Sequence, residues 1–232
     1  MLQALTPYVQ VHLIVKDSNQ QNDIIKKLLR IGVDTIKIKY FYSPYWHFWL
    51  RDYGAVFMKG NKGHLMGIDF GFNCYGNCLA TYQYAKTVDS GDSSIAASMG
   101  LEVVKANIVS EGGDREFNGD GVMITNEAVE FQRNPAKSKE QLETEIKRVL
   151  HVNKIIWLKY PTVSDIKSHI AGRLPTGLFC PGGTGGHVDK LCRFINKNTL
   201  LVARKQKADL QIHYRSWITN IWKQTKHFKK CY

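Results

Sequence analysis

Apolar and polar residues in the first part of the chain follow two periods, one typical of strands and one typical of helices. Val9–Leu13 alternates with the two-residue period of a half-buried strand, and Val33–Tyr40 returns to the same alternation. Between them, an apolar helical face follows the N-cap candidates Asp17-Ser18-Asn19, and Gly32 can close the helix. The pattern predicts a strand–helix–strand unit.

The same two periods continue to about residue 203. The clearest helix is predicted over Lys139–Leu150, introduced by Ser138, with Leu142, Ile146 and Leu150 spaced as its inner face. Strand-rich segments punctuated by single helices predict the α/β class, although no two units share visible sequence identity. The predicted strands are Ala55–Met58, His64–Phe70, Val103–Val109, Gly121–Thr125, Ile155–Leu158 and Thr199–Ala203.

Composition and charge narrow the class of protein. The chain has 232 residues, 44% of them apolar, which is enough for a sizeable core. We read no secretory signal and no apolar run of roughly 18 residues, so a cytoplasmic protein without a membrane partner is expected. The formal charge is +12, but residues 204–232 hold eight Lys or Arg against one Asp. We therefore expect residues 1–203 to form the main domain and residues 204–232 a divergent basic tail.

Three short motifs combine acidic residues, glycines and a histidine. Taken singly, each has a structural explanation: a surface ion pair, a glycine turn, or a hydrogen-bonded core histidine. Their order along the chain is more informative than any one of them. The motifs are Trp49-Leu50-Arg51-Asp52-Tyr53-Gly54, then Glu111-Gly112-Gly113-Asp114 with Asn118-Gly119-Asp120-Gly121, then Gly186-His187-Val188-Asp189 with Arg193-Phe194.

In this order the motifs resemble the agmatine deiminase family and the related bacterial-type peptidylarginine deiminases. The resemblance runs from about Val9 to Ala203 and includes Gln132-Arg133-Asn134-Pro135 and the strand that carries Trp157. It implies a pentein α/β propeller, incomplete here, with strand–helix modules around a central polar site. It also implies hydrolysis of a guanidinium to a ureido group with release of ammonia. The substrate would be agmatine, giving N-carbamoylputrescine for putrescine biosynthesis, or a peptidyl-arginine, giving citrulline.

The resemblance also implies a role for five residues. A guanidinium is a flat cation with N–H donors, which carboxylates bind by paired, charge-assisted hydrogen bonds. If Val188 points into the core of a strand, the residues on either side of it face one pocket. The implied roles are guanidinium binding by Asp52 and Asp189, a further acidic contact by Glu111, a substrate-contacting aromatic at Trp49, and general acid and base catalysis by His187.

The implied activity uses no metal and no cofactor. Its partner is a small guanidine such as agmatine, or an arginine side chain, with no nucleic acid. Homo-oligomerisation is left open by the sequence.

The sequence departs from the family at the nucleophile. The family's cysteine lies well downstream of the third motif, near the end of a longer chain, whereas the resemblance here stops near Ala203. Cys231 lacks the surrounding small and hydrophobic pattern, and Cys192 lies too near His187, so we interpret Cys192 as a core thiol. These departures predict a truncated or frameshifted reading frame in which the nucleophile is not identified. Ala55 also stands where the family prefers proline.

Three alternatives remain open from the sequence. The first is a decayed enzyme that only binds guanidinium ligands. The second is a zinc protein, with Cys74, Cys78, His187 and Cys192 as ligands. The third is nucleic-acid binding through the basic tail. Five cysteines without a small-scaffold spacing do not indicate a disulfide framework.

Overall fold

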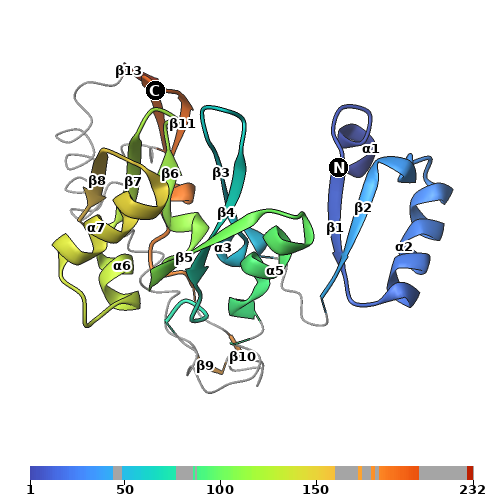
Figure 1. Cartoon of the computed structure of the whole chain (residues 1–232), viewed down its shortest axis with the longest axis horizontal. Coiled ribbons are helices and arrows are strands. Elements are labelled where there is room, and N and C mark those ends of the chain that lie inside the picture. The colour runs from blue at the N-terminus through green and yellow to red at the C-terminus, as the bar shows by residue number, and fades with distance from the viewer. Residues whose placement is uncertain are drawn as a thin grey trace.

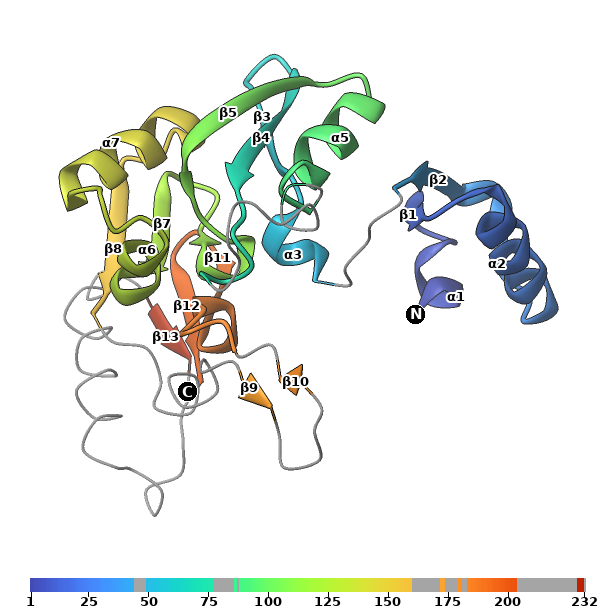
Figure 2. The same ribbon diagram turned by 90° about the horizontal axis from the view of Figure 1, so that it is seen from below.

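The strands of the protein form several small sheets rather than one continuous sheet. The computed structural model describes residues 1–43, 49–76, 86, 88–159, 172–173, 179–180, 183–203 and 229–231. Figures 1 and 2 show one unit lying to one side of a larger body. This unit contains α1 (Leu2–Leu5), β1 (Val11–Val15), α2 (Ser18–Arg30) and β2 (Ile38–Tyr42).

The first unit confirms the predicted strand–helix–strand arrangement. Strands β1 and β2 are parallel, and α2 begins where the Asp17 side chain accepts a hydrogen bond from the Gln20 N–H at 2.8 Å. The second strand begins later than predicted. Asp34 caps a 3₁₀ turn, η1 (Thr35–Lys37), by accepting from the Ile36 N–H at 3.0 Å, and this turn replaces the start of the expected strand.

Three sheets in the body share one topology. In each, two antiparallel strands form a hairpin and a third strand then joins the second in parallel. A parallel pair needs a crossover connection, and α5 (Gly91–Ser98) lies in the first crossover. The sheets are β3 (Val56–Lys59), β4 (Leu65–Gly71) and β5 (Glu102–Val109); β6 (Glu116–Phe117), β7 (Val122–Asn126) and β8 (Lys154–Leu158); and β11 (Cys192–Asn196), β12 (Thr199–Val202) and β13 (Lys229–Cys231).

The crossover from β7 to β8 contains α6 (Glu127–Arg133) and α7 (Lys139–Leu150). Helix α7 has the predicted bounds. Ser138 and Gln141 form a reciprocal capping box at its start, and Leu142, Ile146 and Leu150 are buried as expected. These side chains pack in the main core with residues of β4, β5, β7 and β8. Local periodicity and capping therefore located this helix correctly.

Helix α6 was not predicted. Asn126 caps it by accepting from the Ala128 N–H at 3.0 Å, but its buried residues include Glu130 and Arg133 as well as Val129. Polar residues on the inner face hide the apolar periodicity by which a helix is recognised. Strands β6 and β11 were missed as well.

The α/β class is confirmed, and the repeated hairpin-plus-parallel unit is visible only in the structure. A short antiparallel pair, β9 (Gly172–Arg173) and β10 (Phe179–Cys180), completes the described elements. In the tail, residues 229–231 form β13 beside β12. The domain boundary at residue 203 remains a prediction, because most of residues 204–232 lie outside the described part. No helix within the described ranges is long and apolar enough to cross a membrane.

Candidate active site

Three short helical turns lead into the first strands of the three body sheets. They are α3 (Leu50–Tyr53) before β3, η2 (Gly112–Asp114) before β6, and η3 (Val188–Lys190) before β11. Each turn belongs to one of the three sequence motifs. Turn η2 contacts both α3 and η3. Because the turns occupy equivalent places in repeated units, the fold brings the three motifs together.

His187 lies between two carboxylates that come from the other two motifs. Its Nδ1 is 3.4 Å from Asp52 Oδ1, and its Nε2 is 3.3 Å from Glu111 Oε2. The three residues are almost inaccessible, with relative exposures of 2% for His187, 6% for Asp52 and 0% for Glu111. The sequence expectation that these residues share one site is correct, and their catalytic roles remain predictions.

Asp189 follows His187 in a 3₁₀ turn, so the expectation that this segment is a strand was wrong. The left-handed backbone of Gly185 (φ 82°) and Gly186 (φ 132°) precedes the segment and is incompatible with a continuous strand. Val188 nevertheless points into the core and is fully buried. Asp189 is partly buried, and its charge adds a small contribution to the raised pKa of Asp52, of which burial is the largest cause.

Trp49 occupies the N-cap position of α3. Its backbone carbonyl accepts a hydrogen bond from the Asp52 N–H at 2.9 Å, and its side chain is largely exposed. The structure therefore places Trp49 next to the site in the chain. Contact between its indole and a substrate remains a prediction.

Two glycines allow the turns to meet. A Cβ at Gly113 would overlap Nδ1 of His187 and Oδ1 of Asp52, and a Cβ at Gly112 would overlap the Arg51 carbonyl oxygen. The Gly113 N–H donates to Asp52 Oδ1 at 3.0 Å. The glycines of the second motif are therefore needed for close backbone approach.

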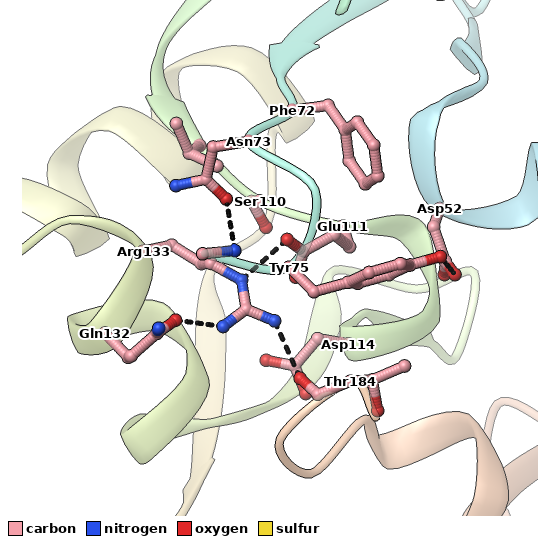
Figure 3. Close-up of polar contacts among 12 residues, drawn as sticks. Asp52, Phe72, Asn73, Tyr75, Ser110, Glu111, Asp114, Gln132, Arg133 and Thr184 are labelled. Atoms are coloured by element: carbon pink, nitrogen blue, oxygen red, sulfur yellow. Dashed lines mark hydrogen bonds and ion pairs between the residues drawn. The ribbon is translucent and has the colours of Figure 1, made fainter. Parts of the chain in front are cut away.

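Arg133 is a site residue to which sequence reasoning assigned no role. Its Nε lies 2.6 Å from Glu111 Oε1, its Nη2 donates to the Thr184 carbonyl at 2.7 Å, and it also bonds Gln132 (Figure 3). Burial acts to raise the pKa of Glu111, but contacts with His187 and Arg133 outweigh it and leave that pKa below its ordinary value. Glu111 is therefore held as a carboxylate. The only sequence signal was the Gln132-Arg133-Asn134-Pro135 segment of the family resemblance.

Tyr75 is a second residue that the sequence did not single out. Its hydroxyl donates to Asp52 Oδ2 at 2.8 Å (Figure 3). Its ring lies edge-on to His187, with centroids 5.9 Å apart. Burial raises the pKa of Asp52, while His187 and the Tyr75 hydrogen bond oppose that effect. No helix, strand or family motif was predicted around Tyr75, so the sequence carried no information on this contact.

A second polar cluster lies behind the site. Thr125 Oγ1 is 2.9 Å from Asp114 Oδ2 and 3.3 Å from Glu130 Oε1, and Ser110 Oγ donates to Glu130 at 2.7 Å. Burial raises the pKa of Asp114 well above its usual range and that of Glu130 to about 7. The Arg115 guanidinium lies 3.7 Å from the centroid of the Phe70 ring. This cluster supports the turn that carries the second motif.

The cysteine geometry does not fit the zinc alternative. Cys74 is disulfide-bonded, and Cys192 is buried with Sγ 3.8 Å from the Val188 carbonyl oxygen. Burial raises the pKa of Cys192 to about 12, which opposes the thiolate that a metal requires. Two of the four suggested ligands are thus engaged elsewhere, and Cys78 lies outside the described residues. The interpretation of Cys192 as a core thiol is confirmed.

The fold and the three meeting turns define a class of protein. Agmatine deiminase from Enterococcus faecalis superposes with a TM-score of 0.77 at 21% identity, covering 99% of this chain and 59% of that one. Agmatine deiminase from C. jejuni with substrate bound superposes with a TM-score of 0.74 at 24% identity, covering 99% and 61%. The chain has the mixed α/β fold of these proteins.

The family model for Porphyromonas-type peptidyl-arginine deiminase matches residues 1–230, and the chain belongs to this family. Agmatine deiminase from Pseudomonas syringae pv. syringae is 31% identical over 159 residues, which is 67% of this chain and 39% of that protein. Agmatine deiminase from Pseudomonas aeruginosa is 29% identical over 169 residues, which is 69% and 40%. The chain spans about two fifths of the length of these curated relatives. The family resemblance found in the three motifs is confirmed.

Proposed function

We propose that this site binds a guanidinium group and takes part in its hydrolysis to a ureido group and ammonia. The observation that carries the proposal is the arrangement of His187, with one ring nitrogen facing Asp52 and the other facing Glu111. A histidine so placed has a hydrogen-bonding partner at Nε2 and a carboxylate 3.4 Å from Nδ1, and these contacts fix the orientation of its ring. General acid and base catalysis requires such a positioned group.

The acidic residues match the charge and shape of the ligand. A guanidinium keeps its charge at physiological pH and presents N–H donors in one plane. Asp52 supplies a carboxylate beside His187, Glu111 adds a buried negative charge, and the charge of Asp189 acts on Asp52. Paired hydrogen bonds from these carboxylates would hold the cation with its central carbon oriented for attack.

The reaction needs a nucleophile and two proton transfers. The nucleophile adds to the guanidinium carbon, and ammonia leaves with a proton supplied by His187. Water, activated by His187, then releases the ureido product and frees the nucleophile. Of the cysteines with a described side chain, Cys192 is buried and Cys74 is disulfide-bonded. Neither of these two supplies the thiolate that the family resemblance implies, so the nucleophile is left unassigned, and the second candidate is a guanidinium-binding protein without turnover.

Agmatine is the substrate we propose, with N-carbamoylputrescine as the product in putrescine biosynthesis. The support is the name of several relatives, among them the agmatine deiminase of Pseudomonas syringae. The family model instead carries the name of a peptidyl-arginine deiminase, so an arginine side chain is the competing substrate.

Replacing His187 tests the catalytic proposal. We expect His187→Ala to lower the rate of ammonia release from agmatine by roughly 10²-fold or more, because one group serves both proton transfers. The exposed His64, which pairs with Glu102 at the surface, provides the matched control His64→Ala. Ammonia and ureido product are measured together for all three proteins. Near-normal release by His187→Ala would remove His187 from catalysis, whereas agmatine binding without release by the wild type would favour the binding protein.

A further inference from the structure

Both oxygens of the Asp52 carboxylate contact groups of the protein itself. Its Oδ1 receives the Gly113 N–H at 3.0 Å and lies 3.4 Å from His187 Nδ1. Its Oδ2 receives the Tyr75 hydroxyl at 2.8 Å. The phenol thus takes one of the two acceptor positions of the oxygen that a guanidinium N–H would need, an argument that rests on the proposed function.

The loop that holds Tyr75 has an unusual backbone. Cys74 (φ 54°), Tyr75 (φ 61°) and Gly76 (φ 77°) are three consecutive residues in the left-handed region, which residues other than glycine rarely adopt. The Asn73 side chain accepts from the Gly76 N–H at 2.8 Å and stabilises the turn. Such strained segments persist where the surroundings hold them and often accompany ligand sites.

The loop that holds Tyr75 also lies against Gln132, on the other side of the site. A Cβ at Gly76 would overlap the Gln132 side chain, so the loop lies directly against that residue. Gln132 bonds Arg133, which pairs with Glu111 (Figure 3). The position of Tyr75 is therefore linked to both carboxylates that flank His187.

We propose that Tyr75 is a positioning residue that acts as a latch: its hydroxyl holds Asp52 Oδ2, competes with a guanidinium for this oxygen and is displaced when the ligand binds. A phenol offers one neutral donor to this oxygen. A guanidinium offers charged donors in a fork that matches a carboxylate. The ligand thus replaces a weaker partner with a stronger one.

Removing only the hydroxyl tests the latch. Tyr75→Phe keeps the ring and its edge contact with His187 but removes the donor to Asp52. We expect agmatine to bind this variant roughly 3- to 10-fold more tightly than wild type by isothermal titration calorimetry, a tenfold gain being about 1.4 kcal/mol. The matched control is Tyr42→Phe, whose hydroxyl bonds Gln21 in the first unit, and its affinity should equal that of wild type.

The direction in which the agmatine affinity changes distinguishes the latch from a purely structural role of Tyr75. If Tyr75 only stabilised the site, loss of its hydroxyl would weaken agmatine binding. Equal or weaker binding by Tyr75→Phe than by wild type therefore overturns the latch, but not the proposed function. Agmatine that binds neither protein overturns the proposed function, and the latch with it. Urea unfolding of each variant shows that the compared proteins are folded.

Discussion

Several ionisable side chains at and near the candidate site are buried. Glu111 and Arg133 form an ion pair with side-chain exposures of 0% and 1%, and Arg115 is buried as well. Burial lowers the pKa of Arg115 to about 10, in spite of the neighbouring carboxylates. Charges that are taken out of water are costly unless they are paired and hydrogen-bonded. The site therefore depends on an internal polar network as much as on the apolar core.

Glu130 makes the stability of this network depend on pH. Burial is the largest cause of its raised pKa, about 7 in the folded protein against an ordinary 4.5. A carboxyl whose pKa is raised by folding favours the folded state most below its unfolded pKa. The free energy of unfolding should thus fall as pH rises from about 4.5 to about 7, and Asp114 acts in the same direction.

Glu130→Gln tests this dependence, because the amide cannot ionise but its oxygen can still accept from Ser110. We expect the fall in the free energy of unfolding between about pH 5 and pH 7.5 to become smaller by on the order of 1–3 kcal/mol. Urea unfolding across this range measures it. Glu140, which is fully exposed on α7, gives the control Glu140→Gln with an unchanged slope. An unchanged slope in Glu130→Gln as well would contradict the assigned titration.

At the scale of elements, the site is made by the approach of α3, η2 and η3. The backbone of η2 passes between the other two turns, and Gly113 touches both Asp52 and His187. A glycine is required here because a Cβ would be too close to the neighbouring side chains. Its backbone angle is not the reason, because its φ is not in the left-handed region. A side chain at this position must push the turns apart.

Gly113→Ala should therefore reduce ligand binding at the site more than it reduces the stability of the fold. We expect at least a tenfold loss of agmatine affinity, because displacement of Asp52 or His187 by a few tenths of an ångström weakens aligned hydrogen bonds. Calorimetry measures the affinity. Gly60→Ala is the matched control, since a Cβ at Gly60 meets only the His64 carbonyl oxygen at an ordinary 3.7 Å. Equal affinities for the two variants would show that close approach at Gly113 is not needed.

Elements with strong local signals were predictable from the sequence, and long-range contacts were not. Helix α7 was located by its periodicity and by Ser138 at its start, and strands β3 and β4 by their apolar segments. The site residues Asp52, Glu111 and His187 were found through the family motifs, although His187 and Glu111 are 76 positions apart. Tyr75 and Arg133 carry no local pattern, because their partners lie elsewhere in the chain. Only the packed structure identifies them.

At the scale of the whole molecule, the candidate site is built by three sheets that repeat one topology. Each of the three sheets with the same topology follows a helical turn, and η2 contacts both of the other turns. The three motifs are far apart in sequence because each belongs to a different unit. The arrangement explains how a chain without visible sequence repeats still builds one acidic site around a histidine.

The central claim is that this acidic site recognises a guanidinium rather than any cation. The most direct test is calorimetric binding of agmatine and of 1,4-diaminobutane, which lacks the guanidinium, to wild type, Asp52→Asn and the exposed control Asp120→Asn. We predict that wild type and Asp120→Asn bind agmatine at least tenfold more tightly than the diamine, and that Asp52→Asn loses this preference. Equal binding of the two ligands by wild type, or an undiminished preference in Asp52→Asn, would contradict the account.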